Sequence, residues 1–211
     1  MKWDSLLALV GDEPVFSTGL LLSGGASERG VRLQLSRWVK TGRLHQLRRG
    51  LYALAPPWRK VEPHPFLVAN RIRQGSYVSL QSALAWHGAI PEHVPVVTSV
   101  GAGRPERYET PVGIYQFHHL APDLRFGYLR IEVASRQFAF VASAGKALLD
   151  LIHLTPGADS SDYLHELRLQ NPAVFDNPPL ESLAERSGKP KLMRAAKRAG
   201  ALLAEEEGEP L

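Results

Sequence analysis

Residues 35–57 read LSRWVKTGRLHQLRRGLYALAPP, and they decide how the first part of the chain folds. A helical pattern of apolar residues ends at Gly42, and two short apolar runs, RLHQL and LYALA, then flank the tripeptide RRG. Gly50 stands where a hairpin turn needs a residue that tolerates positive φ, and Tyr52 follows it in the second run. The stretch therefore predicts the end of a helix followed by a basic β-hairpin.

Three helices are predicted before this hairpin. The segments DSLLALVG, with Asp4 as a candidate N-cap, and STGLLLSGG each indicate a short helix. The third helix is predicted to begin at Ser27, its candidate N-cap, and to run to about Thr41. Gly30 lies near the start of this helix, where it costs about 1 kcal/mol of helix propensity.

The third predicted helix has two different sides. At 100° per residue, Val31, Leu35, Trp38 and Val39 share an apolar side. The opposite side carries five polar or basic residues: Arg29, Arg32, Ser36, Arg37 and Lys40. One side is therefore predicted to face the core, and the other is free for water or a ligand.

Three helices followed by a basic hairpin are the layout of a winged helix-turn-helix. In that fold the third helix enters the major groove, and the hairpin, or wing, contacts phosphates. The candidate DNA-binding residues are the five outer-face positions and three arginines of the hairpin: Arg29, Arg32, Ser36, Arg37, Lys40, Arg43, Arg48 and Arg49. The same layout also serves in protein-interaction modules, where such a basic face is merely solvated.

The distribution of charge supports an anionic partner for this part of the chain. Residues 1–60 hold ten Lys and Arg against four Asp and Glu, a net charge of +6. Because the whole chain carries +4, the remainder carries −2. An excess of positive charge at one end of a chain favours binding of an anionic partner there.

Prolines mark the boundary after the hairpin, because Pro56, Pro57, Pro63 and Pro65 interrupt both helix and sheet. The sequence predicts an α+β protein: a winged domain over 1–57, a Pro-rich linker over 58–65 and a larger domain over 66–211. That domain should hold two helices and a mostly antiparallel or mixed sheet, and be helical from about 143. The predicted strands are VPVVTSV, ERYET, GIYQFHHL, YLRIEVA and QFAFVA.

No catalytic, cofactor or metal site is predicted. In SAGKALLD, Ala147 follows Lys146 where a phosphate-binding loop needs Ser or Thr. The acids Asp123, Glu132 and Asp150 are scattered, and Asp150 with His153 lacks further ligands at a matching spacing. We therefore expect a protein that is not an enzyme.

A second basic strip occurs near the end of the chain. On the helix predicted over 190–205, Lys191, Arg194 and Arg198 share one face and form a candidate partner-binding site. These charges can be solvated, can pair with acids at 159–185, or can meet an anionic partner. The sequence leaves the three alternatives open.

Composition also bears on the expected location. The chain has no cysteine, which fits a reducing compartment. An acid lies within the first apolar stretch, MKWDSLLALVGDEP, which is unlike a secretory signal, and no apolar run reaches the length of a membrane span. We expect a cytoplasmic protein with no membrane partner.

Several segments resemble the AbiEi-type antitoxins and transcriptional regulators of bacterial toxin–antitoxin and phage-resistance operons. The N-terminal match is VFSTGLLLSGGASERGVRLQLSRWVKTGRLHQLRRGLYAL, in which Gly42, Gly50 and Tyr52 match structural residues of the wing. The later matches are YVSLQSALAWHGAIPEHVPVVTSV, GIYQFHHLAPDLRFG and VASAGKALLDLIHL. The resemblance implies a DNA-binding autorepressor of inverted repeats in its own promoter, acting as antitoxin to a nucleotidyltransferase-like toxin.

Two other classes of function compete with this reading. One is a winged regulator without a toxin partner, whose C-terminal domain binds a small effector. The other is a nuclease or transferase with a winged targeting domain, which would need clustered acids or a set of metal ligands. A closed polar pocket would favour the effector-binding regulator.

Overall fold

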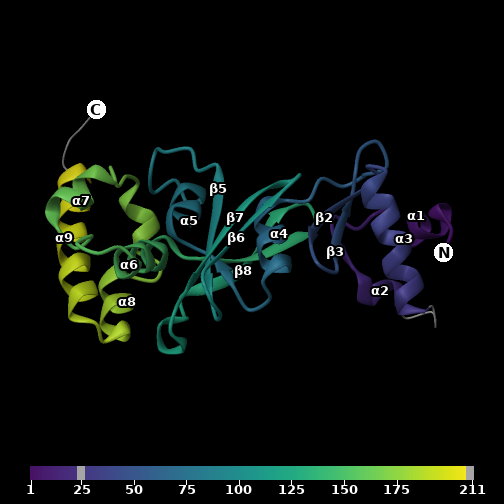
Figure 1. Ribbon diagram of the computed structural model, residues 1–211. Coiled ribbons are helices and arrows are strands. Elements are labelled where there is room, and N and C mark those ends of the chain that lie inside the picture. Colours follow the sequence, from purple (N-terminus) through teal and green to yellow (C-terminus); the bar gives the residue numbers. More distant parts are fainter. Residues whose placement is uncertain (23–26, 208–211) are drawn as a thin grey trace.

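The computed structural model describes residues 1–22 and 27–207, and its architecture is α+β, as predicted. The molecule is elongated, with the N-terminal helices at one end, the strands in the middle and the C-terminal helices at the other end (Figure 1). No helix within the described residues combines the length and apolar character that a membrane span requires.

The first part of the chain combines helices with a small antiparallel sheet of strand order β1-β3-β2. Phe16 of β1 pairs with Tyr52 of β3, and Leu44 of β2 pairs with Leu54 of β3. The elements in chain order are α1 Trp3–Val10, β1 Phe16–Ser17, α2 Thr18–Leu22, α3 Glu28–Lys40, β2 Leu44–Arg48 and β3 Leu51–Leu54. The predicted helix–hairpin sequence over 27–55 is therefore confirmed.

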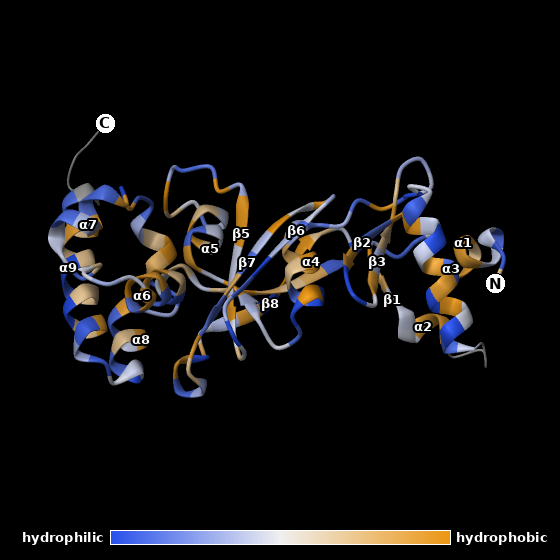
Figure 2. Ribbon diagram, viewed as in Figure 1, coloured by the Kyte–Doolittle hydropathy of each residue, from blue (hydrophilic) through white to orange (hydrophobic). Residues whose placement is uncertain are grey.

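The two sides of α3 differ as the periodicity predicts. Val31, Leu35 and Trp38 are buried in a core shared with α1, α2 and the small sheet. Hydrophobic and hydrophilic residues alternate along the ribbon of α3 (Figure 2). Packing of this apolar stripe fixes α3 on α1 and leaves its other side exposed.

The helix ends differ in detail from the prediction. Lys2 holds the N-cap position of α1, so that Asp4 lies inside the first turn. Ser27 is at the N-cap of α3, but its side chain makes no capping hydrogen bond. Residues 23–26, at the end of the second predicted helix, lie outside the described residues.

A six-stranded mixed sheet of order β6-β7-β5-β4-β9-β8 forms the centre of the molecule. The pairs β4–β9 and β5–β7 are parallel, and the other neighbours are antiparallel. The strands are β4 Tyr77–Val78, β5 Val96–Gly101, β6 Glu106–Thr110, β7 Gly113–His119, β8 Tyr128–Ala134 and β9 Gln137–Ala142. The helices α4 Pro65–Ile72 and α5 Leu80–Trp86 flank β4 in the chain and pack on the sheet.

The C-terminal helices pack around α6 Ala144–Leu154, which is buried over residues 144–152. The Ser143 side chain caps α6 by accepting a hydrogen bond from the Lys146 backbone N–H. The remaining elements are η1 Pro122–Leu124, α7 Ser161–Glu166, η2 Pro172–Phe175, α8 Leu180–Ser187 and α9 Pro190–Glu207. The predicted onset of helical structure near residue 143 is confirmed.

The strand β3 of the small N-terminal sheet is buried on both of its faces. Tyr52 and Leu54 of β3 pack into the core of α1–α3. Leu51 and Ala53 of the same strand belong instead to the larger core that includes the central sheet. Alternate side chains of a strand point to opposite faces, so β3 connects the two cores.

The segment between β3 and α4 is held in place by Gln137 of β9. The Gln137 side chain accepts a hydrogen bond from the His64 backbone N–H at 2.8 Å and donates one to the Glu62 carbonyl at 2.9 Å. Pro63 between them is buried. The proline-rich segment thus joins the two parts through specific contacts.

Candidate nucleic-acid interface

The exposed side of α3 carries all five residues that the sequence singles out. Its members are solvent-exposed: Arg29, Arg32, Ser36, Arg37 and Lys40. Arg32 donates to Glu28, one turn earlier, at 2.5 Å between Nη2 and Oε1. Among the described residues, Arg29, Arg37 and Lys40 have no acidic partner, so their donors are available to an anionic ligand.

Leu33 interrupts this polar surface. It is 54% exposed, although it is a large apolar residue on a well-packed helix. The exposure of Leu33 agrees with the predicted helix phase, because the same phase buries Val31 and Leu35. An apolar side chain among donors suits contact with a thymine methyl group.

Arg43 has a different environment from the residues of α3. Its guanidinium lies 5.1 Å from the ring centroid of Trp3 and 5.7 Å from that of Trp58. Trp3 also packs edge-on against Trp38, with 5.0 Å between ring centroids. Arg43 therefore links α1, α3 and the segment after the hairpin, and its cation–π contacts compete with any role toward DNA.

The two arginines of the hairpin tip are not equivalent. Arg49 is exposed, whereas Arg48 is half-buried and donates from Nη1 to the Arg49 carbonyl at 3.2 Å. Burial raises the pKa of Tyr108 on β6, and the positive charge of Arg48 opposes this shift. Arg48 thus lies on the side of the hairpin that meets β6, which leaves Arg49 as the exposed charge at the tip.

The turn itself is anchored to the start of α2. Gly50 has φ +81°, and its carbonyl accepts a hydrogen bond from the Thr18 backbone N–H at 3.0 Å. A residue with a side chain at this φ would be strained, as the sequence predicts. This hydrogen bond therefore holds the hairpin turn beside the N-terminus of α2.

The C-terminal basic strip is used within the fold. Lys191 donates from Nζ to the carbonyls of Ile152 and Thr155, at 2.6 and 2.7 Å, at the end of α6. Arg194 pairs with the Asp159 carboxylate at 3.0 Å, and Arg198 donates to the Asp159 backbone carbonyl. Of the three alternatives for this strip, the structure shows pairing with other groups of the same chain.

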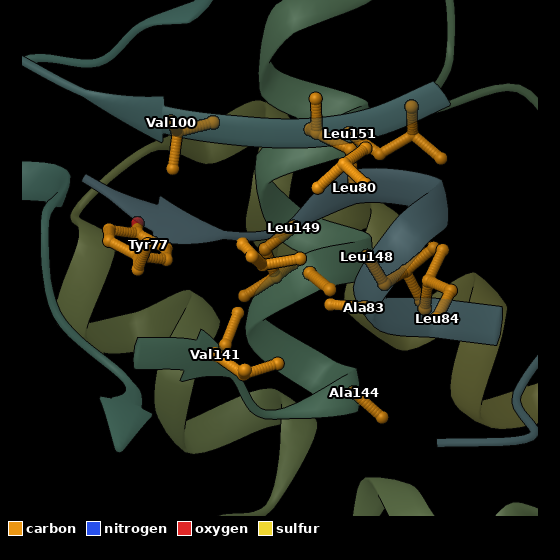
Figure 3. Close-up of a cluster of buried hydrophobic side chains, with 14 of the residues drawn as sticks. Tyr77, Leu80, Ala83, Leu84, Val100, Val141, Ala144, Leu148, Leu149 and Leu151 are labelled. Carbon is orange, nitrogen blue, oxygen red and sulfur yellow. The ribbon is translucent and has the colours of Figure 1, made fainter. Parts of the chain in front are cut away.

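The most buried polar site was not predicted as a site from the sequence. The Asp150 carboxylate accepts hydrogen bonds from Ser79 Oγ at 2.8 Å, from Tyr77 OH at 3.0 Å and from Lys146 Nζ. Tyr77 belongs to the same buried cluster as Leu148, Leu149 and Leu151 of α6 and Val141 of β9 (Figure 3). The only sequence signal for this network is the spacing of Lys146 and Asp150, four residues apart on one helix.

Burial controls the ionisation of this network. It lowers the pKa of Lys146, and the Asp150 carboxylate opposes that shift. It also raises the pKa of Tyr77, and Asp150 raises it further. Lys146 and Asp150 are 3% and 2% exposed, so the network ties β4 to α6 and offers no open face to a substrate.

The acids considered for catalysis remain apart. Asp123 lies 3.9 Å from Lys189, and Glu132 accepts a hydrogen bond from the Arg136 backbone N–H. Among the described residues, no three His, Asp or Glu side chains gather closely enough to hold a metal ion. Within the part of the chain that the structure describes, Arg29, Arg37 and Lys40 form a row of exposed cations on α3 without an ion-pair partner.

No protein-family model matches this chain, and no curated protein is significantly similar to it. The function is therefore inferred from geometry and charge. The exposed face of α3 can donate hydrogen bonds and positive charge to an elongated anion.

Proposed function

We propose that this protein is a transcriptional repressor that binds double-stranded DNA through a winged helix-turn-helix formed by residues 1–57. The proposal rests on the exposed face of α3, where Arg29, Arg37 and Lys40 have no acidic partner within residues 1–22 and 27–207, while the opposite face is buried. The order of elements, with β1 pairing to the hairpin strand β3, supports the winged class.

The residues divide into two roles in this proposal. The outer face of α3 enters the major groove, where arginine recognises guanine and Leu33 can contact a thymine methyl. Arg49 at the hairpin tip contacts a phosphate, which positions the protein without reading sequence. Arg43 and Arg48 act indirectly, since their half-buried side chains hold the hairpin and its neighbours.

The resemblance to AbiEi-type regulators extends the proposal to the biological partner. On this reading the operator is an inverted repeat in the protein's own promoter, and the C-terminal part opposes a nucleotidyltransferase-like toxin. The proposed toxin partner is supported by the sequence segments that resemble AbiEi-type regulators. The proposed DNA binding is supported by the exposed charges of α3. A regulator that responds to a small ligand is the second candidate, because a pocket of about 420 Å³ adjoins the segment between α1 and β1.

A promoter reporter tests the proposal in cells. The wild-type protein should repress its own promoter, and the variant Arg37→Ala should relieve repression while its cellular amount stays unchanged. Arg104→Ala is the matched control, because Arg104 is exposed and has no acidic partner but lies far from α3 in the chain. Repression by Arg37→Ala equal to that of the wild type would remove α3 from the interface.

A further inference from the structure

A pocket of about 420 Å³ lies where the connection between α1 and β1 meets the central sheet. Glu13 and Pro14 line it from the N-terminal part. The other walls are the end of α4 and the strands β8 and β9. The volume lies within the range of pockets that bind small molecules, about 300–1,000 Å³.

Three arginines line this pocket: Arg71, Arg130 and Arg136. All three are exposed, and none has a carboxylate of the described residues within salt-bridge distance. Neighbouring arginines behave differently, since Arg73 pairs with Glu106 and Arg107 pairs with Glu109. Glu13 is the one acid in the lining, so the pocket has an excess of two positive charges.

Two phenylalanines from β9 complete the pocket. Phe140 is 44% exposed although it is a large apolar residue. The guanidinium of Arg130 lies 3.9 Å from the ring centroid of Phe138. Cationic groups beside accessible aromatic rings are the combination that binds phosphates together with nucleobases.

Arg136 occupies a backbone conformation that normally selects glycine or asparagine. Its φ is +58° in the turn between β8 and β9. A side chain in the left-handed region costs about 1 kcal/mol. Arg136 holds this conformation in the wall of the pocket, so its side chain is a candidate for contact with a ligand.

We propose that this pocket binds a nucleotide, with its phosphates on Arg71, Arg130 and Arg136 and its base against Phe140. Glu13 and the Gln74 side chain supply polar groups for the sugar or the base edge. The same chemistry is offered by a free nucleotide and by a nucleotide of a single-stranded RNA.

The position of the pocket gives this binding a regulatory consequence, which rests on the proposed function. Glu13 and Pro14 lie three and two residues before the start of β1, whose partner β3 packs on the core of α1–α3. A ligand that contacts these residues and the central sheet at once favours one arrangement of the two parts. Nucleotide and operator DNA should therefore change each other's affinity by the same factor.

Isothermal titration of the full chain tests the site without DNA, using ATP, GTP, adenosine, inorganic triphosphate and a short oligouridylate. We expect a nucleotide or the oligonucleotide to bind with a Kd below about 1 mM, and adenosine and triphosphate to bind more weakly. Arg71→Ala or Arg130→Ala should weaken binding about ten- to hundred-fold, the effect of one charge-assisted hydrogen bond. Phe140→Leu should weaken it about ten-fold through lost stacking.

Arg136→Gly separates ligand binding from folding. Glycine relieves the strain at φ +58°, so the variant should melt at the same or a higher temperature while binding the ligand more weakly. Arg104→Ala should leave binding unchanged. Tighter binding of the free nucleotide identifies a small effector, and tighter binding of the oligonucleotide identifies an RNA.

Absence of binding by every probe would overturn the proposal. Binding that survives all four pocket substitutions, or that disappears instead in Arg29→Ala and Arg37→Ala, would also overturn it. If the wild-type protein binds a nucleotide but no duplex DNA, only the proposed repressor function is refuted. The two proposals therefore fail independently.

Discussion

The basic face of α3 and the basic strip of α9 contain similar residues in different surroundings. Arg29, Arg37 and Lys40 on α3 face solvent, without acidic partners in the described part of the chain. On α9, Lys191 caps the end of α6, and Arg194 pairs with Asp159. We therefore propose a ligand for the basic face of α3 and none for the basic strip of α9.

Removal of the buried Trp38 side chain, which packs α3 onto the core, should have the largest effect on folding and on duplex binding. Trp38 is 5% exposed in the core of α1–α3, and truncation of a buried tryptophan costs about 3–5 kcal/mol. Trp38→Ala should therefore unfold the N-terminal part and abolish duplex binding. Region-resolved hydrogen exchange should show protection lost around α3 and retained in α6 and α9.

Leu33→Ala provides the control for this comparison. Leu33 lies on the exposed side of the same helix, so its truncation should change stability by no more than about 0.5 kcal/mol. Equal protection in Trp38→Ala and Leu33→Ala would show that the two sides of α3 have been assigned wrongly.

Lys191→Ala should produce the next largest effect, which should appear in stability and not in duplex binding. Its ammonium donates to two carbonyls at the end of α6, and loss of such charged hydrogen bonds costs about 1.5–3 kcal/mol. The midpoint of urea unfolding should fall, while duplex affinity stays unchanged. Lys197→Ala, an exposed change on the same helix, should alter neither quantity.

The hairpin tip should give the smallest effect. Arg49→Ala removes an exposed charge, so the slope of log affinity against log salt should become flatter by about 0.9. Arg48→Ala should leave the salt slope unchanged, because Arg48 lies toward β6. Identical salt slopes for the wild type and Arg49→Ala would exclude the hairpin from the DNA interface.

The parts predictable from the sequence are those with a local signal. The faces of α3, the turn at Gly50 and the cap at Ser143 follow from periodicity and from residues that suit caps and turns. The strands β1 and β4 were missed because each has only two residues, too few to show alternation. Their places are fixed by pairing with distant strands.

The uses of individual charges were less predictable, because their partners are far away in the chain. Arg43 meets Trp3 and Trp58, and Lys191 meets the end of α6, contacts that no short pattern encodes. The pocket for which we propose a nucleotide joins residues 13–14 to residues between 67 and 76 and between 130 and 140. Such a site exists only after the two parts of the chain pack together.

One titration tests the central claim, that the charges of α3 bind DNA. The wild type, the variant Arg29→Glu/Arg37→Glu/Lys40→Glu and the control Arg186→Glu/Lys189→Glu/Lys197→Glu are compared on a labelled duplex of the protein's own promoter. Both variants change the net charge equally, and every substituted residue is exposed. We expect the α3 variant to lose at least about a hundred-fold in affinity, since each lost base or phosphate contact costs about 1–3 kcal/mol, while the control stays close to the wild type. Equal affinities of the two variants would contradict the account.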